Sequence, residues 1–357
     1  MKFLRDLNLK KKRVLVRVDF NEPIKNGELT SDFRIKAAIP TIEYLLAEES
    51  KIILVTHLGR PDGKIIEELR TDPIAECLKK LIGRPVKKLD GYEVSQSEEE
   101  IILLENVQFH PGEKSKDPQF IGELAELADF FVLDAFGQAH RDYASISGLS
   151  DVMPSCAGLL LEKEIKTLSR VLGNSGHPLV FIIGGAKIST KMKVIENFLE
   201  KADNVLLGGA LANTVLKAKG IDVKKSVVED EMLEQAEKIL KNPKLYLPTD
   251  WIFSDEMILD IGPKAIEEFK EIILKAKTVV FNGPMGLFEK DQFKSGSEEI
   301  ARAVADNSGY SLAGGGDTIA LLEGLNLLDK ISHVSTGGGA MLDFLAGKKL
   351  PGIEALK

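Results

Sequence analysis

The sequence is poor in cysteine and has no long apolar segment. Its two cysteines, Cys77 and Cys156, lie far apart and belong to no CxxC or Cys/His pattern, so neither a disulfide framework nor a zinc site is supported. No apolar run reaches the roughly 18 residues that a membrane-spanning helix needs, and the opening segment MKFLRDLNLKKKR lacks the apolar centre of a signal peptide. The sequence therefore predicts a cytoplasmic protein with no membrane partner.

Two common nucleotide-binding motifs are also absent. The chain contains no GxxxxGK[ST] and no GxGxxG, which leaves neither a Walker P-loop nor a dinucleotide fingerprint. The formal net charge of −8 argues against a nucleic-acid partner. Any nucleotide must therefore be held in another way.

Arginine is scarce after the first 150 residues, where only Arg170 and Arg302 occur. Guanidinium groups suit bidentate capture of phosphate and carboxylate, so this bias indicates that the N-terminal half binds a small polyanion. Solvated surface charge is the alternative for any one of them. The arginines of the first half are Arg5, Arg13, Arg17, Arg34, Arg60, Arg70, Arg84 and Arg141.

Apolar, β-branched runs alternate with helical patterns along almost the whole chain of 357 residues. This alternation predicts an α/β fold, and the length favours two domains. We expect two doubly wound, Rossmann-like domains with parallel sheets, joined by a hinge helix. The strand-like runs are RVLVRVDF, KIILVTHL, EIILLENV, DFFVLDAF, PLVFIIGG, NVLLGGAL, KTVVFNGP, GYSLAGGG and SHVSTGGG; the clearest helical patterns are FRIKAAIPTIEYLLAEE, DPIAECLKKLIG and GPKAIEEFKEIILKAK.

The predicted boundary lies in SDVMPSCAGLLLEKEIKTLSRVLG, where a loop with a proline gives way to a long amphipathic helix. We expect an N-terminal domain at 1–152, a hinge helix region at 153–173 with its helix near 156–172, and a C-terminal domain at 174–340. The last segment, 341–357, is expected to dock back toward the N-terminal domain.

Glycines follow the apolar runs of the second half. In open parallel sheets ligands bind at the carboxyl ends of the strands, and glycine there lets phosphate oxygens approach main-chain N–H groups at a helix start. Close packing of helix against sheet is the alternative, and it becomes less convincing as such junctions accumulate. The positions are Gly184, Gly185 and Lys187; Gly208 and Gly209; Asn282, Gly283 and Pro284; Gly314 to Asp317; and Gly337 to Gly339.

Some polar residues at these junctions are candidates for binding a metal ion or a phosphate. Asp317 and Thr318 begin a helical pattern, where they are either a plain helix cap or a site for Mg²⁺ bound to a nucleotide. Lys187 and Lys191 are four residues apart and are expected on one helix face, either solvated or neutralising a phosphoryl group.

The strand ends of the first half read VDFNEP, THLGRP, ENVQFHPGE and DAFGQAHR. A single histidine is usually structural, but two His/Arg pairs at equivalent strand ends, HLGR and AHR, favour an anion site. The candidate residues are Asp19, Asn21, Arg34, His57, Arg60, His110, His140 and Arg141.

At these residues the sequence closely resembles the phosphoglycerate kinase family. The match extends nearly from end to end, and the ordered set of motifs is highly specific. The matching segments are RVDFNEP, DFRIKAAIPTI, THLGRPDGK, LLENVQFHPGE, DAFGQAHR, GGAKIS, DIGPKAIEEF, NGPMGLFE, GGGDT, SHVSTGGGA and LPGIEAL.

The resemblance implies a monomeric, two-lobed enzyme that transfers a phosphoryl group from 1,3-bisphosphoglycerate to ADP, with Mg²⁺. It implies that Arg34, Lys187, Gly316 and Gly339 face the transferring group and that Asp317 holds the metal. The glycerate substrate would be bound by Asp19, Asn21, Arg34, His57, Arg60, Gln108 and Arg141. The nucleotide would be bound by Gly185, Lys187, Lys191, Gly208, Gly209, Gly262, Asn282, Pro284, Glu289, Gly314, Gly315, Gly316, Asp317 and Thr318.

This chain departs from the family pattern at several positions. Gln108 replaces an arginine that normally contacts the substrate phosphate, which weakens one contact by on the order of 1 kcal/mol. Leu133, Gln138, Thr190 and Met341 also differ. A family member with impaired catalysis therefore remains an alternative, as does another two-lobed α/β phosphotransferase. A dehydrogenase would need the missing dinucleotide fingerprint, and a solute-binding protein would leave GGAK and GGGDT unexplained.

Overall fold

The computed structural model describes residues 1–94 and 97–357. Its contacts divide the chain into two compact units. Unit 1 contains Met1–Lys166 and Lys349–Lys357, and unit 2 contains Thr167–Lys348. In the described part of the chain no helix is long and apolar enough to span a bilayer.

Unit 1 is built on a parallel sheet in the order β5-β6-β4-β1-β7-β8. Successive residues of its central strands are buried on both faces, as helices on both sides of a parallel sheet require. Val14 and Val16 pack in the core with the helix residues Ile35 and Ile42, while Leu15 on the other face is equally buried. The strands are β1 (Arg13–Val18), β4 (Lys51–Val55), β5 (Lys87–Leu89), β6 (Ile101–Leu104), β7 (Phe130–Asp134) and β8 (Ser155–Ala157), with a hairpin of β2 (Ile24–Lys25) and β3 (Glu28–Leu29).

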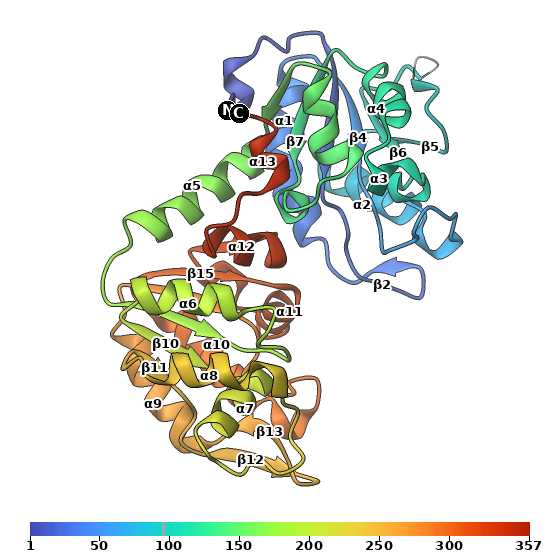
Figure 1. Ribbon diagram of the computed structural model, residues 1–357. Helices are drawn as coiled ribbons and strands as arrows, with labels where there is room; N and C mark the ends of the chain where they lie inside the picture. The colour runs from blue at the N-terminus through green and yellow to red at the C-terminus, as the bar shows by residue number, and fades with distance from the viewer. Residues whose placement is uncertain (95–96) are drawn as a thin grey trace. The chain divides into compact units, whose positions relative to one another are not determined.

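The helices of unit 1 flank this sheet (Figure 1). They are α1 (Phe33–Ala47), α2 (Asp72–Ile82), α3 (Gly112–Ser115), α4 (Pro118–Ala125), the first part of α5 (Leu159–Gly173) and α13 (Pro351–Glu354). The chain's last helix, α13, packs on the π-helical turn η6 (Ala144–Gly148), and the Gly352 N–H donates to the Ala139 carbonyl at 2.9 Å.

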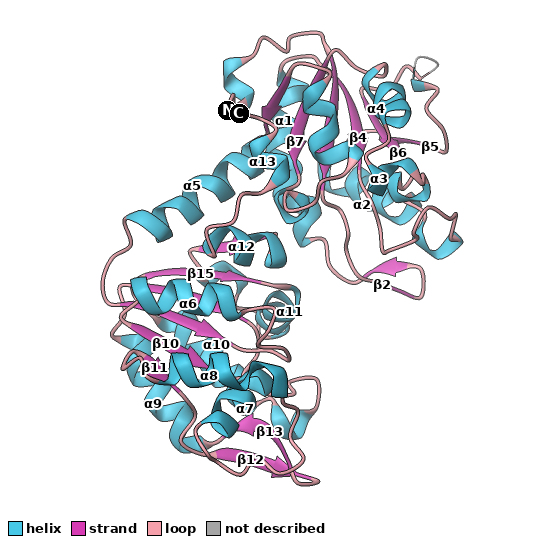
Figure 2. Cartoon of the chain, viewed as in Figure 1, coloured by secondary structure: helices cyan, strands magenta, loops and turns pink. Residues whose placement is uncertain are grey.

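Unit 2 repeats the architecture with a parallel sheet in the order β11-β10-β9-β14-β15-β16 (Figure 2). Its central strand β9 is fully buried and its side chains alternate between two cores: Val180 and Ile182 pack with Phe269 of α9, while Phe181 stacks on Phe198 of α6 at 4.0 Å. The strands are β9 (Leu179–Ile183), β10 (Asn204–Leu207), β11 (Leu245–Tyr246), β14 (Thr278–Asn282), β15 (Tyr310–Gly314) and β16 (His333–Ser335).

Seven helices, the last part of α5 and a hairpin complete the described part of unit 2 outside the short helical turns. The hairpin pairs β12 (Trp251–Ser254) with β13 (Met257–Ile261) in antiparallel register and has a bulge between Ile252 and Phe253. The helices are α6 (Met192–Lys201), α7 (Gly209–Ala218), α8 (Leu233–Leu240), α9 (Pro263–Leu274), α10 (Ser295–Asp306), α11 (Gly316–Gly324) and α12 (Gly338–Leu345).

The predicted fold class is confirmed, and each predicted strand-like run contains a parallel strand of one of the two sheets. The predicted start of the hinge helix is wrong. Residues 155–157 form strand β8, where Cys156 pairs with Val132 of β7 and is fully buried, so helix α5 begins only at Leu159.

Candidate active site

The predicted anion-binding residues of unit 1 follow parallel strands at one edge of the sheet. Asp19 and Asn21 follow β1, His57 and Arg60 follow β4, Gln108 follows β6, and Arg141 follows β7, while Arg34 lies in the first turn of α1. Carboxyl ends of parallel strands meet at the same edge, so the fold gathers residues that are far apart in the sequence.

Asp19 and His57 form the buried floor of this edge. Both are at most 5% exposed, and His57 Nδ1 lies 3.9 Å from Asp19 Oδ1. Gln138, one of the positions that depart from the family pattern, donates from Nε2 to Asp19 Oδ2 at 3.4 Å. The floor is therefore a polar network with little access to water.

Arg34 is held in place by the loop that follows β1. Its backbone N–H donates to Glu22 Oε1 at 2.5 Å, and its Nη1 donates to Glu22 Oε2 and to the Asn21 carbonyl, both at 3.0 Å. Asn21 in turn accepts from the Gly59 N–H at 2.8 Å, which ties the β1 loop to the β4 loop. The guanidinium is partly buried and pre-positioned.

The remaining predicted residues of unit 1 differ in exposure. Arg60 and Arg141 are exposed at the surface. Gln108 is only 5% exposed, and its Oε1 has no hydrogen-bond partner in the described structure. His110 stacks on Phe120 at 3.8 Å and accepts from the Gly112 N–H, which is a structural arrangement.

Electrostatics set the charge state of the floor. Burial, together with the positive charges of Arg17, Arg34 and Arg141, lowers the pKa of His57 to about 3, although Asp19 opposes the shift. Burial alone would raise the pKa of Asp19, but the nearby cations lower it overall. At neutral pH this edge therefore holds a neutral imidazole, a carboxylate and several guanidinium groups.

In unit 2 the glycine turns at the carboxyl ends of β9, β10 and β14 pack directly against one another. A Cβ on Gly184 would lie 1.9 Å from the Pro284 carbonyl oxygen, and one on Gly209 would lie 2.6 Å from the Gly185 nitrogen. Gly283 has φ +91°, a conformation that L side chains rarely adopt. Only bare backbone fits at this junction.

Lys191 and Asn282 fasten these turns together. Lys191 Nζ donates to the Gly184 carbonyl at 2.5 Å and to Asn282 Oδ1 at 3.1 Å, while Asn282 Nδ2 donates to the Gly314 carbonyl at 2.6 Å. Burial lowers the pKa of Lys191 to about 8, and Asp317 opposes the shift. Thr318 is fully buried and accepts from the Gly283 N–H at 2.7 Å.

Lys187 and Lys191 do not share a helix face, and that prediction is wrong. Helix α6 begins at Met192, and Lys187 lies in the preceding loop, which Gly185 enters with φ +113°. Thr190 donates to the Lys187 carbonyl at 3.1 Å, and Ser189 donates twice to Glu229, at 3.0 and 2.5 Å. This loop presents Lys187 at the surface.

The helix starts of α11 and α12 lie at the same edge. Gly315 is the N-cap of α11 with φ +107°, and a Cβ on Gly338 would lie 2.7 Å from the Gly315 Cα. Asp317 lies in the first turn of α11 and is exposed, so it is not the capping residue. Met341 is fully buried against Gly314, where a Cβ would lie 2.6 Å from its sulfur.

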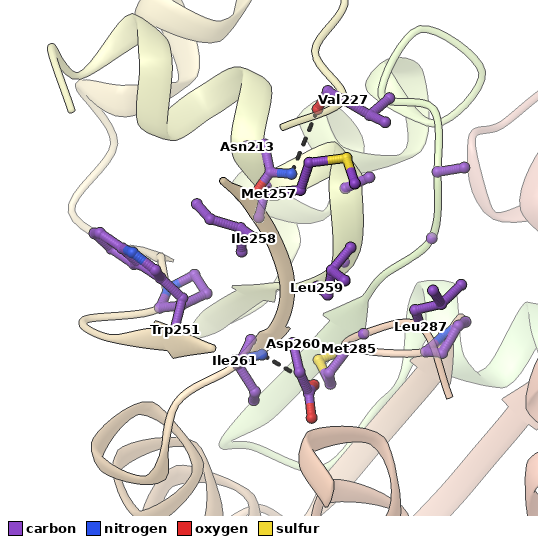
Figure 3. A pocket seen from close by; sticks show the side chains of 18 of the residues that line it. Asn213, Val227, Trp251, Met257, Ile258, Leu259, Asp260, Ile261, Met285 and Leu287 are labelled. Atoms are coloured by element: carbon purple, nitrogen blue, oxygen red, sulfur yellow. Dashed lines mark hydrogen bonds between the residues drawn. The ribbon is translucent and has the colours of Figure 1, made fainter. Parts of the chain in front are cut away.

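A mainly apolar cavity of about 350 Å³ opens beside these turns. Figure 3 shows Trp251, Ile258 and Met285 among its walls, and Asn213 donating to the Val227 carbonyl at 3.4 Å. Burial raises the pKa of Asp260, another lining residue, to about 6. Of the predicted nucleotide-binding residues, those that line the cavity are Gly185, Gly209, Pro284, Glu289 and Asp317.

Other predicted residues do not line this cavity, and some lining residues escaped prediction. Gly262 is the N-cap of α9 and packs on Asp250, whose carboxylate accepts from the Ala265 N–H at 2.8 Å. Gly208 packs on Met285. The hairpin that supplies Trp251 was not predicted, although the apolar runs WIF and MILDI on either side of Asp255 and Glu256 were an available signal.

The residues around Asp317 fit a Mg²⁺ ion that is bound mainly through a nucleotide. No cluster of three or more acidic, histidine or cysteine ligands occurs within residues 1–94 and 97–357. One exposed carboxylate beside glycine turns suits Mg²⁺, which commonly takes one or two carboxylates together with phosphate oxygens and water.

Comparison with known proteins agrees with this geometry. The model of the phosphoglycerate kinase family matches residues 4–348. The chain is 46% identical to a phosphoglycerate kinase of Moorella thermoacetica, covering 99% of this chain and 98% of that protein. It is also 46% identical to a phosphoglycerate kinase of Dictyoglomus turgidum, with the same coverage.

Solved structures are similar over the same extent. A phosphoglycerate kinase from Coxiella burnetii matches with a TM-score of 0.86 and 40% identity, covering 99% of this chain and 98% of that one. A phosphoglycerate kinase from Pyrococcus horikoshii matches with a TM-score of 0.89 and 35% identity, covering 100% and 98%.

Proposed function

The chain belongs to the phosphoglycerate kinase family, and from this premise we propose how its own residues carry out the reaction. The enzyme is a phosphotransferase with a carboxyl group as acceptor. It transfers a phosphoryl group reversibly between 1,3-bisphosphoglycerate and ADP, giving 3-phosphoglycerate and ATP. The roles of individual residues below are proposals.

We propose that unit 1 binds the glycerate substrate. Arg34, fixed by Glu22, and the exposed Arg60 and Arg141 supply charge for the carboxylate and phosphate groups. Asp19 and Asn21 would bind the substrate's hydroxyl and carboxyl end, and neutral His57 would donate one hydrogen bond. Gln108 would provide a neutral contact where a cation is typical.

Unit 2 would bind the nucleotide in two different ways. The apolar cavity with Trp251 and Met285 suits a purine base and ribose, with Glu289 at its polar rim. The glycine turns and the starts of α11 and α12 suit phosphates, because bare N–H groups and the positive helix end favour anions. Lys191, which fastens those turns, keeps a cation beside them.

We propose direct in-line transfer without a covalent enzyme intermediate. An acyl phosphate is already reactive, so positioning and charge stabilisation carry the catalysis. Arg34, Lys187 and the N–H groups at Gly316 and Gly339 would neutralise charge on the migrating group. Closure of the two units would bring the substrates together and exclude water that otherwise hydrolyses the acyl phosphate.

When bound at Asp317, Mg²⁺ would neutralise phosphate charge. The chain's own part is to hold that carboxylate in the first turn of α11, beside the phosphate-binding turns. We also propose, from the family resemblance, that the enzyme acts as a cytoplasmic monomer on small molecules rather than on nucleic acid. Light scattering of the purified protein tests the monomer.

One observation carries this proposal above the others. The cation-rich site of unit 1 lies at the carboxyl ends of the parallel strands of its sheet. In unit 2 the apolar cavity beside the glycine turns lies at the carboxyl ends of the strands in the same way. A coupled assay with MgATP and 3-phosphoglycerate tests it. We expect turnover that requires both substrates and the metal, and saturable binding without turnover would instead identify an impaired member of the family.

A further inference from the structure

Arg17 is a fully buried arginine in the middle of unit 1. It belongs to β1, where the apolar run RVLVRV would place an aliphatic residue, and it is 0% exposed. Its Nε donates to Ser145 Oγ at 2.8 Å, and its Nη1 donates to the Val18 carbonyl and, at 3.5 Å, to the Val55 carbonyl. A buried charge is costly unless it is paired, so a specific role is expected.

The remaining guanidinium nitrogen faces a histidine. Arg17 Nη2 lies 3.3 Å from His57 Nδ1, and both side chains are buried. A guanidinium has five N–H donors and no acceptor, so the imidazole nitrogen in this contact must offer its lone pair. The proton of a neutral His57 ring then lies on Nε2.

We propose that Arg17 is a positioning residue, which holds His57 as the neutral imidazole protonated at Nε2. On the proposed function, on which this role rests, His57 offers the substrate an N–H donor rather than a positive charge. The arginines then supply the positive charge that attracts the glycerate substrate, and His57 orients the substrate through one hydrogen bond. The histidine's contribution becomes independent of pH across the physiological range.

A second group competes for the same nitrogen. Asp19 Oδ1 lies 3.9 Å from His57 Nδ1, beyond hydrogen-bonding distance. If Arg17 were absent, Nδ1 would face this carboxylate, which would favour a proton on Nδ1 or a cationic ring. Arg34 and Arg141 are the other charges that act on His57, and both disfavour the cation.

The guanidinium is fixed by a network that reaches across the unit. Ser145 lies in η6, accepts from Arg17 Nε, and donates from its hydroxyl to Glu113 Oε1 at 2.6 Å and from its N–H to Glu113 Oε2 at 3.0 Å. Glu113 is fully buried and provides a counter-charge for Arg17. The position of Arg17 is therefore set by the fold and does not depend on a bound substrate.

Nuclear magnetic resonance of the ¹⁵N-histidine-labelled full chain tests this directly, without substrate. Long-range proton–nitrogen spectra distinguish the two neutral tautomers from the cation, and a His57→Gln variant assigns the signal among the five histidines. We expect His57 to show the Nε2–H pattern unchanged from about pH 5 to about pH 8, where an ordinary histidine titrates near 6.5. A titrating His57, or one protonated at Nδ1, overturns the proposal.

Two variants separate positioning from general stability. Arg17→Met keeps the length of the side chain but removes the donors, while the burial that disfavours a cationic ring remains. His57 is therefore expected to carry its proton on Nδ1, facing Asp19; Arg17→Lys keeps a cationic donor and is expected to restore the Nε2–H form. An unchanged His57 spectrum in folded Arg17→Met contradicts the proposal. If Arg17→Met does not fold, the wild-type spectrum still decides.

Binding of 3-phosphoglycerate provides the functional readout. The ratio of the variant's dissociation constant to that of the wild type cancels the titration of the substrate's own phosphate. This ratio is expected to exceed one severalfold in Arg17→Met, because a ring protonated at Nδ1 offers the substrate no Nε2–H donor, and to return toward one in Arg17→Lys. A ratio near one in Arg17→Met contradicts the role in substrate binding. Complete failure of the wild type to bind 3-phosphoglycerate refutes the proposed function and leaves the tautomer result standing.

Discussion

The two units use the same sheet architecture to build two different kinds of binding site. In unit 1 the strand ends carry charged and polar side chains, such as Asp19, His57 and Arg34, held by hydrogen bonds to one another and to the backbone. In unit 2 the strand ends carry glycines whose main chains pack together, beside an apolar cavity. One site is made mainly of side chains and the other mainly of backbone.

This difference follows from what each site is proposed to hold. A small acid with few atoms must be recognised by several directed charges, whereas a nucleotide offers a large apolar base and a phosphate chain that approaches bare N–H groups. Substitutions should therefore act differently in the two units. In unit 1 they should change affinity, and in unit 2 many should first change folding.

The largest effect is expected at Gly184. Gly184→Ala places a Cβ 1.9 Å from the Pro284 carbonyl oxygen, and a backbone atom cannot move aside cheaply. We expect a loss of more than about 4 kcal/mol in the free energy of unfolding of unit 2, measured by chemical denaturation. Gly316→Ala is the matched control, since within the described residues no atom outside its own chain neighbours and helix backbone lies within 4 Å of its Cβ position, and it should unfold like the wild type. Equal stability of the two variants would contradict the packed junction.

Next in size is the loss of Lys187, an exposed cation in the loop before α6 of unit 2. Lys187→Ala is expected to reduce turnover by about 10²- to 10³-fold with little change in ADP affinity, because the charge acts mainly in the transition state. Steady-state kinetics and nucleotide titration measure the two quantities. Lys193→Ala removes an exposed lysine of α6 nearby and should leave turnover unchanged. Normal turnover of Lys187→Ala would remove this lysine from the mechanism.

The sequence predicted the central strands of both sheets correctly, but it did not predict the loop that carries Lys187. The apolar runs predicted the central strands correctly, because strands covered on both faces by helices are apolar throughout. Lys187 was wrongly placed on a helix, since spacing alone cannot show that Gly185 turns the chain with φ +113° before helix α6 begins.

Short edge elements also escaped prediction. Strand β5 contains Lys87 and Lys88, and strand β8 has only three residues, so neither carries an apolar run. The burial of Arg17 was equally hidden, because its partner Ser145 lies 128 residues away in the sequence. The sequence therefore showed which functional groups are present. Their charge state and exposure depend on packing between residues that are far apart in the sequence.

A smaller effect is expected at Gln108 of unit 1. Gln108→Arg restores a charge-assisted contact, and we expect 3-phosphoglycerate to bind severalfold more tightly, by on the order of 1 kcal/mol. Isothermal titration measures the dissociation constant. Gln119→Arg adds the same charge on the exposed side of α4 and controls for general attraction. An unchanged constant in Gln108→Arg would mean that another group already fills this role.

A pH-dependent effect on stability is expected at Asp134, at the end of β7. Burial raises its pKa from 3.8 to about 7, although hydrogen bonds from Thr41, Leu161 and Leu160 oppose the shift. The folded state therefore binds more protons than the unfolded state between these values. This carboxyl contributes stability that is fully present below about pH 4 and is lost as pH rises through about 7.

Asp134→Asn should remove this part of the pH dependence. We expect the free energy of unfolding of the wild type to fall relative to that of the variant between about pH 4 and about pH 7. Urea denaturation at both pH values measures it, and Asp151→Asn, an exposed aspartate of the same unit, serves as the control. Parallel profiles for wild type and Asp134→Asn would show that Asp134 is ionised in the folded protein.

The division of labour between the units can be measured directly by amide chemical-shift mapping of the full chain with each substrate alone. We predict that 3-phosphoglycerate shifts amide signals around Asp19, His57 and Arg34, whereas ADP with Mg²⁺ shifts those around Gly209, Asp317 and the cavity hairpin. Both ligands perturbing the same unit would contradict the account.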